Sequence, residues 1–472
     1  MTVYKVLDAY RGLVIAPAGC GKTHLISETL RVSQSKPYLV LTHTTAGVAS
    51  LKQKLRRLSV PATNYVVTTI DGWALRLANF FPALCPIVSS PGNGKAYYPE
   101  LRQKAVNLLN SGQISDIIRA SYSRLLVDEY QDCDLNQHQL VQALSLTLPT
   151  VVFGDPMQCI FNFGGPMPDW AKEVEAYFPT IQELNTPWRW NNAGTPALGE
   201  WILHCRQLLS QGHKIDLTSC PAHVFSHQLT GNSRTDLQSQ QGIHYALLQS
   251  HPSESLLILG DSTSPKLRHE FAKLTPNIDV VEPVEFRDII ASAAELDIAS
   301  GMNLVEVVLK TAANMMTNVE APQTLQRLNS IIAGRNRTPP TPVEHYLSCL
   351  AQDPTRANML NIFQHLELKE GVRIYRKSAF HALKEAISIS IHSPEQSISD
   401  AAAKVRERIR HTGDKRIPHR AIGSTLLLKG LECEHAIILN AGALNSKNLY
   451  VALSRGAKSI NVFAQSNLVG GW

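Results

Sequence analysis

The sequence predicts an α/β protein built from two domains with parallel sheets, each of which carries an inserted subdomain. Three observations predict this fold class. Short β-branched apolar runs alternate with helical patterns, which is typical of a parallel sheet covered by helices on both faces. A glycine-rich loop joins the first apolar run to the first helical pattern. The alternation is interrupted in each half of the chain, which indicates one insertion per domain.

In the first half, the apolar runs expected to form strands are GLVIAP (12–17), YLVLT (38–42), YVVTTI (65–70), RLLVDEY (124–130) and TVVFGD (150–155). The stretch 82–123 breaks the rhythm with PGNGKAYYP and a helical segment. We therefore expect a small insertion there, within a first domain that covers residues 1–190.

A long helix is expected near 191–211. The strands expected after it are SLLILGD (255–261), IDVVEP (278–283), AIGSTLLL (421–428), HAIILN (435–440) and SINVFA (459–464). Between 285 and 412 the pattern is helical, interrupted by the turn signals TPPTP and HSPEQ. We expect a helical insertion there, within a second domain that covers residues 191–472.

Composition excludes several classes of protein. The chain has 472 residues, of which 44% are hydrophobic and 18% charged, which excludes a disordered or fibrous protein. No apolar run approaches the ~18 residues of a membrane span, and the first apolar stretch runs into the glycine-rich loop rather than forming a signal peptide. The net charge of +6 permits nucleic-acid binding without requiring it. The eight cysteines form no C-x-x-C pair, so we expect a reducing cytoplasm.

The strongest motif is APAGCGKT, which follows a predicted strand and opens a predicted helix. Backbone N–H groups of such a loop, aided by the helix N-terminus, bind phosphate groups. The two glycines allow a tight backbone, the lysine neutralises the β- and γ-phosphates, and the threonine hydroxyl ligates Mg²⁺. The alternative is an ordinary strand–turn–helix with a chance GKT. The residues expected at the nucleotide are Ala16, Pro17, Ala18, Gly19, Cys20, Gly21, Lys22 and Thr23.

A second motif, LLVDEYQD, places two acidic residues at the end of an apolar strand. Asp128 is expected to hold the metal through its water shell, and Glu129 to orient and deprotonate the attacking water. A DE pair after a strand is often only a helix cap, but the phosphate loop upstream favours the catalytic interpretation.

With these motifs the sequence resembles the UvrD/Rep-like helicases of superfamily 1. The similar segments run in the family's order: AxxGxGKT, LTHTTAGVASL (41–51), TTIDGWA (68–74), DEYQD, GDPMQCIFNF (154–163), TPWRW (186–190), LKGLE (428–432) and YVALSRG (450–456). The resemblance implies two RecA-like motor domains with ATP and Mg²⁺ as cofactors.

The resemblance also implies roles for single residues at the ATP site. Gln158 is similar to the glutamine that contacts the catalytic water or the γ-phosphate and couples hydrolysis to DNA. Arg189 and Arg455 resemble the two arginine fingers that spread the transition-state charge. Glu432 is similar to the glutamate that contacts the ribose. For each arginine the alternative is a surface salt bridge.

On the polynucleotide side, aromatic faces stack on bases of any sequence and hydroxyl groups bind phosphates. The aromatic candidates are Trp73, Phe161, Phe163 and Trp188, and the polar candidates are Thr42, His43 and Thr69. The alternative for the aromatic residues is a place in the core, since aromatics beside strands usually fill cores.

The sequence departs from the family in ways that bear on coupling and base selection. No glutamine precedes the phosphate loop to read adenine, so strict preference for ATP is in doubt. Gly164, Leu426, Pro187 and Trp188 replace residues that the family usually has as arginine, histidine, asparagine and tyrosine.

The function implied is an ATP-dependent DNA helicase or translocase that moves 3′ to 5′ on single-stranded DNA or at a single/double-strand junction, with no membrane partner. The alternative is a nucleic-acid-sensing ATPase subunit that regulates a partner nuclease. Short UvrD-like chains resembling this one occur beside nucleases in the Gabija type of anti-phage defence, and that link is an analogy.

Overall fold

The computed structural model describes residues 2–90, 94–161, 165–260, 265–282, 286–412 and 418–471. Two compact units make up the chain. Unit 1 comprises Met1–Gln228 and Ala441–Trp472, and unit 2 comprises Leu229–Asn440.

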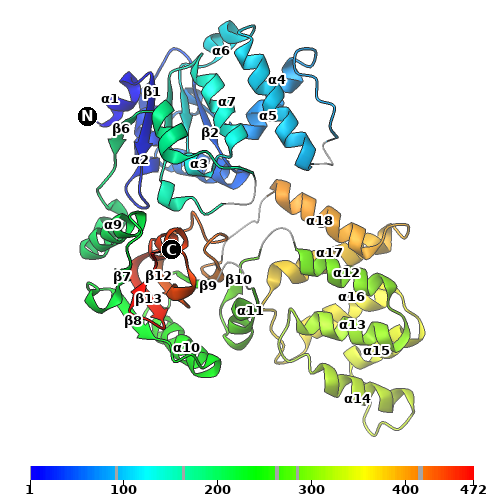
Figure 1. The fold of residues 1–472 in the computed structure, drawn as a ribbon. Helices are drawn as coiled ribbons and strands as arrows, with labels where there is room; N and C mark the ends of the chain where they lie inside the picture. Colours follow the sequence, from blue (N-terminus) through cyan, green and yellow to red (C-terminus); the bar gives the residue numbers. More distant parts are fainter. Residues whose placement is uncertain are drawn as a thin grey trace. The chain divides into compact units, whose positions relative to one another are not determined.

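Unit 1 is centred on a six-stranded sheet with the order β3-β2-β4-β5-β1-β6, in which neighbouring strands run parallel. Its strands are β1 (Arg11–Ile15), β2 (Tyr38–Thr42), β3 (Tyr65–Thr69), β4 (Leu125–Val127), β5 (Thr150–Gly154) and β6 (Thr180–Glu183). Helix α1 (Thr2–Asp8) precedes these strands, and the helices between them are α2 (Lys22–Arg31), α3 (Thr45–Arg57), α4 (Ile70–Phe80), α5 (Gly94–Asn110), α6 (Ser115–Ser121) and α7 (Leu135–Ser145). Figure 1 shows α4, α5 and α6 in blue to cyan.

Successive residues of the central strands pack into two different cores. Leu13 of β1 lies in the core formed with α4, α5 and α7, whereas Val14 lies in the core formed with α1, α2 and α3. Leu125 and Leu126 of β4 divide in the same way. Because side chains alternate across a strand, apolar residues at every position are buried under helices on both faces. The parallel pairing of β1, β4 and β5 brings their carboxyl ends to one edge of the sheet.

The rest of unit 1 comes from two stretches of sequence, one directly after the first sheet and one from Ala441 onward. Its helices are α8 (Trp188–Ala193), α9 (Pro196–Ser210) and α19 (Ser446–Leu453), and its strands are β7 (Ile215–Asp216), β8 (Val224–Gln228), β13 (Gly456–Ala464) and β14 (Leu468–Val469). A second six-stranded sheet has the order β10-β11-β9-β12-β13-β8, of which the last two strands are in unit 1.

Unit 2 contains the other four strands of that sheet and a helical insertion. The strands are β9 (Leu256–Gly260), β10 (Asp279–Val280), β11 (Arg420–Ser424) and β12 (Cys433–Ile438), with helices α10 (Ser233–Ser250) and α11 (Pro265–Leu274). The insertion is α12 (Arg287–Ile298), α13 (Gly301–Ala313), α14 (Ala321–Ile332), α15 (Pro342–Gln352), α16 (Arg356–Leu368), α17 (Lys377–His392) and α18 (Ile398–Thr412). These seven helices have a core of their own and lie together in Figure 1.

The predicted fold class is confirmed, since the chain has two parallel six-stranded sheets and helices are inserted in the sequence of each. The helix expected near 191–211 is instead two helices, because Gly194 caps α8 in the left-handed conformation and Pro196 starts α9. Strands β6, β7, β8 and β14 were not predicted. Strands β6 and β8 lie at sheet edges and contain few buried side chains, so neither has the apolar run that marks a buried strand. Strands β7 and β14 have two residues each. Among the described residues, no helix combines the length and apolar character needed to cross a membrane.

Candidate functional site

The loop between β1 and α2 has the backbone of a phosphate-binding loop. Gly19 and Gly21 adopt left-handed conformations, with φ of 72° and 89°. Gly21 caps α2 without any side-chain hydrogen bond, so the first N–H groups of the helix face the loop with no capping side chain. A Cβ on Gly19 would lie 2.7 Å from the ring of Trp190. Glycine is therefore required there by both conformation and space.

Lys22 meets the two acidic residues predicted at the end of β4. Its Nζ lies 3.0 Å from Asp128 Oδ1 and forms an ion pair with Glu129 Oε1. Lys22 and Asp128 are largely buried, whereas the Glu129 side chain is 34% exposed. Glu129 has a φ of 56°, rare for a residue with a Cβ, and its N–H donates to Asp128 Oδ1 at 2.9 Å.

The charges of this group are coupled. Burial alone would lower the pKa of Lys22, but the Asp128 and Glu129 carboxylates outweigh burial and raise that pKa. Burial raises the pKa of Asp128, against the opposing attraction of Lys22. The lysine therefore stays charged. Cys20, in the same loop, has a pKa raised to about 12 by burial and by the negative charge of Asp155, so its thiol adds no negative charge where phosphates would bind.

Asp155, which directly follows β5, organises the next part of the site. Its Oδ1 accepts two hydrogen bonds from Arg206 of α9, from Nε at 3.0 Å and Nη2 at 2.9 Å. Its Oδ2 accepts a hydrogen bond from Nε2 of Gln158 at 3.1 Å, and its N–H donates to Oε1 of Gln131 at 3.2 Å. Gln131 Nε2 in turn donates to Glu129 Oε2 at 2.5 Å. A chain of hydrogen bonds thus connects Gln158 to the DE motif.

The two predicted arginine fingers lie within unit 1 and both donate hydrogen bonds to Ser454. Arg189 donates from its N–H to Gly19 O at 3.1 Å and from Nη1 to Ser454 O at 2.5 Å. Arg455 is 2% exposed and donates from Nη2 to Ser454 Oγ at 2.7 Å. Tyr450, also buried, accepts a hydrogen bond from Ala18 N–H at 2.9 Å. The last helix of the chain is therefore attached directly to the phosphate loop.

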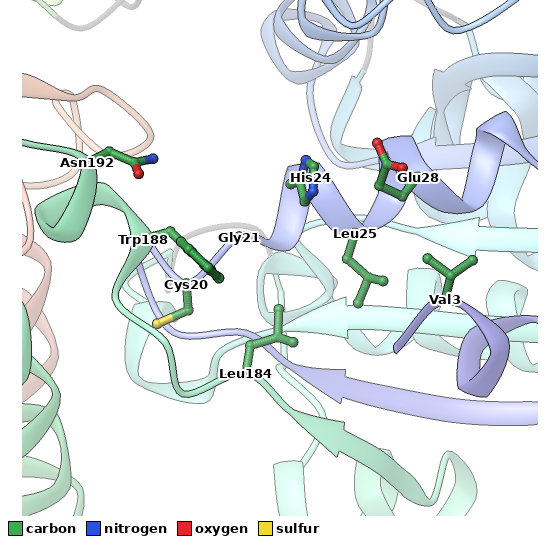
Figure 2. Close-up of a pocket in the computed structure, with 9 residues that line it drawn as sticks. All are labelled: Val3, Cys20, Gly21, His24, Leu25, Glu28, Leu184, Trp188 and Asn192. Atoms are coloured by element: carbon green, nitrogen blue, oxygen red, sulfur yellow. The ribbon is translucent and has the colours of Figure 1, made fainter. Parts of the chain in front are cut away.

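A cavity of about 600 Å³ opens beside the loop. Figure 2 shows side chains from α1, α2 and the segment 184–192 around it. Its lining residues are Val3, Cys20, Gly21, His24, Leu25, Glu28, Leu184, Trp188 and Asn192. Trp188 is 53% exposed and lies 3.1 Å from the position of a Cβ on Gly21. The indole is thus an accessible aromatic face beside the phosphate loop.

The residues predicted to contact the polynucleotide differ in their exposure and in the side chains or backbone groups that they contact. Trp73 is 3% exposed and packs in the core of unit 1, so no face of its ring is open to a base in this structure. Thr42 is 2% exposed. His43 lies against Phe161, with 5.9 Å between ring centroids. The Thr69 hydroxyl caps α4 by accepting from Gly72 N–H at 2.9 Å.

Two further predicted residues complete the set. Phe163 lies outside the described residues. Glu432 is exposed in unit 2, immediately before β12.

Sequence reasoning missed Arg206, Tyr450 and the cavity. Arg206 lies in no recognised motif, and an arginine in a helical segment that also contains Glu200 and Gln207 gives no signal of its own. Tyr450 stands inside a recognised motif, but its contact with Ala18 joins positions 432 residues apart. The cavity takes its walls from three separate segments, so no single stretch of sequence indicates it.

Comparisons with known proteins point to one family. Residues 87–179 match the UvrD/REP helicase N-terminal domain. Over 221 residues the chain is 27% identical to an ATP-dependent helicase/nuclease subunit from Lacticaseibacillus casei (strain BL23), and equally to the protein of the same description from Lacticaseibacillus paracasei. Each alignment includes 44% of this chain and 16% of the relative, so the chain matches only a small part of those proteins.

Among solved structures, the chain is similar to Arterivirus nonstructural protein 10, a helicase, in complex with DNA. The TM-score is 0.36 at 7% identity, over 98% of this chain and 62% of that chain. The structure of the same helicase described without DNA gives a TM-score of 0.31 at 8% identity, over 98% of this chain and 61% of that chain. The family match and the curated relatives confirm the resemblance to UvrD/Rep-like helicases.

Proposed function

We propose that this UvrD/Rep-like chain hydrolyses ATP and couples hydrolysis to movement along single-stranded DNA, in the 3′ to 5′ direction. The observation that carries the proposal is the meeting of Lys22 with Asp128 and Glu129 at the carboxyl edge of the first sheet. A phosphate loop, a buried lysine and two carboxylates at one point are the parts that phosphoryl transfer to water requires.

The donor set fits a magnesium nucleotide. The hydroxyl of Thr23 and the carboxylate of Asp128 are hard oxygen ligands of the kind that Mg²⁺ prefers. When bound, the ion would neutralise charge on the β- and γ-phosphate oxygens. Lys22, which pairs with the carboxylates in this structure, would move its ammonium group from the carboxylates to the phosphates, so that Glu129 can accept a proton from water.

Hydrolysis needs charge stabilisation as well as a base. Arg189 and Arg455 are always protonated and present several N–H donors in a fixed plane, which suits the γ-phosphate oxygens. Gln158, aligned by Asp155, would orient the attacking water. Because Asp155 also joins Gln131 to this group, a change at Gln158 would be transmitted to the DE motif.

The cavity beside the loop would hold the base of the nucleotide. Its open aromatic face is Trp188, and Leu25 and Val3 supply apolar surface on another wall. Trp188 thus serves the nucleotide in this proposal rather than a DNA base. The polar side chains that line the cavity are His24, Glu28 and Asn192. None of them is the glutamine that reads adenine in the family. We therefore propose that selection between ATP and GTP is weak.

Movement on DNA is supported by the family resemblance and by one pair of aromatic rings. The 3′ to 5′ direction is supported by the resemblance alone. His43 and Phe161 form a ring pair at which a base could stack. Residues 1–190 and 191–472 would act as the two motor domains that ATP draws together. The second candidate function is an ATPase that controls a partner nuclease, and the relatives named as helicase/nuclease subunits favour it.

Steady-state hydrolysis of ATP and GTP by the purified chain, with and without single-stranded DNA, tests the proposal. Lys22→Ala and Glu129→Gln are expected to lower the rate by about 100-fold or more, since each removes a group that acts in the transition state. Glu200→Gln, an exposed carboxylate of α9, is the matched control and should keep the full rate. Hydrolysis that survives Glu129→Gln would overturn the assignment of the site.

Displacement of streptavidin from the end of biotinylated single-stranded DNA then separates the two functions. A motor that moves 3′ to 5′ displaces streptavidin from a 5′-biotin end without help from another protein. Hydrolysis that responds to DNA without any displacement would favour the nuclease-control function. Displacement from the 3′ end alone would contradict the proposed direction.

A further inference from the structure

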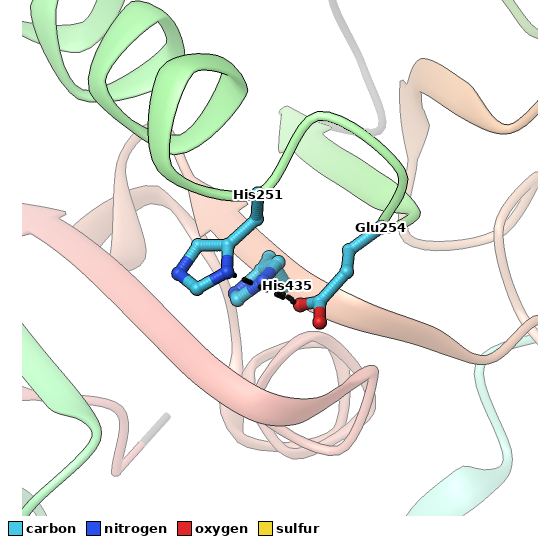
Figure 3. A group of neighbouring side chains, drawn as sticks. All are labelled: His251, Glu254 and His435. Carbon is cyan, nitrogen blue, oxygen red and sulfur yellow. Dashed lines mark hydrogen bonds and ion pairs between the residues drawn. The ribbon is translucent and has the colours of Figure 1, made fainter.

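Three side chains of types that commonly bind metals meet in unit 2. They are His251, which caps the end of α10, Glu254 in the following loop, and His435 in β12. Figure 3 shows the two imidazole rings and the carboxylate directed toward one another. Their ligand atoms all lie within 4.8 Å of one another. Two imidazoles and a carboxylate are a ligand set that divalent transition metals, zinc above all, bind well.

The distances from Glu254 to the two histidines fit one ion with a small adjustment. Glu254 Oε2 lies 3.6 Å from His251 Nδ1 and 2.6 Å from His435 Nε2. Ligand atoms around tetrahedral zinc are about 3.3 Å apart, since each bond is about 2.0–2.1 Å long. The first pair is already near this spacing. The second pair, now a hydrogen bond, would open by less than 1 Å as the metal replaces the shared proton.

The backbone holds the three positions in place. The N–H of Glu254 donates to His251 O at 3.2 Å, and the N–H of His435 donates to Ser255 O at 3.1 Å. His435 also pairs in register with Leu256 of β9. Because a site assembled by the fold loses less entropy on binding than a flexible one, these bonds favour metal binding over a chance encounter of side chains.

Burial differs among the ligands in a way that suits an open site. The side chain of His435 is 5% exposed and that of Glu254 22%, whereas that of His251 is 43% exposed. An ion can therefore enter from the side of His251, and a water molecule can take the fourth position.

We propose that His251, Glu254 and His435 bind one divalent transition-metal ion, with Zn²⁺ the best fit. The ion would fasten the end of α10 and the loop before β9 to β12. Strand β12 directly follows the LKGLE motif (428–432), so the metal would also stiffen the chain beside that motif. This inference does not depend on ATP hydrolysis.

The test uses the full chain without a histidine tag, stripped with a chelator, re-equilibrated with Zn²⁺ under reducing conditions and assayed for bound metal after gel filtration. We expect about one ion per chain. His251→Asn and Glu254→Gln should weaken binding by about 100-fold or more, since loss of even an outer-shell partner costs about 10- to 100-fold. His213→Asn, an exposed histidine outside the cluster, should bind like the wild type.

Thermal unfolding gives a second measure. Zn²⁺ should raise the Tm of the wild type and of His213→Asn but not that of His251→Asn. Because His251 is partly exposed, its substitution should leave the metal-free Tm unchanged, so that loss of binding is not loss of folding. No retained zinc in the wild type, or equal zinc in wild type and His251→Asn, would overturn the proposal and leave a hydrogen-bonded Glu–His pair.

Discussion

At the scale of single residues, the buried carboxylate of Asp155 in unit 1 depends on a single arginine for its charge partner. The side chain of Asp155 is 0% exposed, and that of its partner Arg206 is 14% exposed. The guanidinium compensates the charge that burial would otherwise disfavour. Such a pair need not add net stability, but removing one partner leaves an uncompensated buried charge.

We expect Arg206→Leu to lower the free energy of unfolding by about 3 kcal/mol. Arg206→Lys keeps the charge but loses the two-point contact, so its effect should be smaller. Urea denaturation measures both. Arg119→Leu removes a pair in which both side chains are more than half exposed and should change stability by less than about 0.5 kcal/mol. Equal effects of Arg206→Leu and Arg119→Leu would contradict the role given to burial.

At the scale of elements, threonine side chains define the starts of two helices next to the first sheet. Thr44 caps α3 by accepting from Gly47 N–H at 3.0 Å, and Thr69 caps α4 in the same way. An N-cap oxygen satisfies one of the N–H groups that a helix leaves unpaired. Part of the TTIDGWA motif therefore has a structural role, whatever contact it makes with DNA.

We expect Thr69→Ala to destabilise the chain by about 1 kcal/mol, the usual effect of losing a cap. Thr69→Ser retains the oxygen and should unfold at nearly the wild-type urea concentration. If the serine variant binds single-stranded DNA normally while the alanine variant binds weakly even when fully folded, the hydroxyl also contacts DNA. Identical stability of all three proteins would show that the cap contributes nothing.

At the scale of the whole molecule, buried histidines make stability depend on pH. Burial, the largest cause, lowers the pKa of His244 to about 4 and that of His269 to about 4. In the unfolded chain both rings titrate near 6.5, so the unfolded state binds more protons between these values. Their contribution to stability is therefore intact above about pH 6.5 and is lost as the pH falls toward 4.

His244 packs edge-on against Phe271, so His244→Phe keeps an aromatic ring in the core while removing the titrating group. Between pH 7.5 and pH 5 the wild type should lose about 2 kcal/mol relative to this variant. Urea denaturation at both pH values, in the same buffer and ionic strength, measures the difference. Parallel pH profiles for the two proteins would contradict the proton linkage.

The sequence alone predicted the features of local structure that depend on residues close together in the chain. Residues 38–42 form the strand that their apolar run predicts, and the glycines of the phosphate loop take the left-handed backbone that only glycine adopts freely. Sequence also assigned Lys22, Asp128 and Glu129 to one nucleotide site by their motifs, and the parallel strands bring their carboxyl ends to one edge of the sheet. Each inference rests on local patterning plus a general rule of sheet geometry.

Tertiary structure alone decided which side chains are covered and which distant ones touch. Trp73 and Trp188 were both predicted to stack on bases. Trp73 is 3% exposed in the core, whereas Trp188 is 53% exposed beside the phosphate loop. Arg206 meets Asp155 from 51 residues away, and His435 meets Glu254 from 181 residues away. Burial and long-range contact depend on how complete elements pack, and packing is a property of the folded chain that no short stretch of sequence contains.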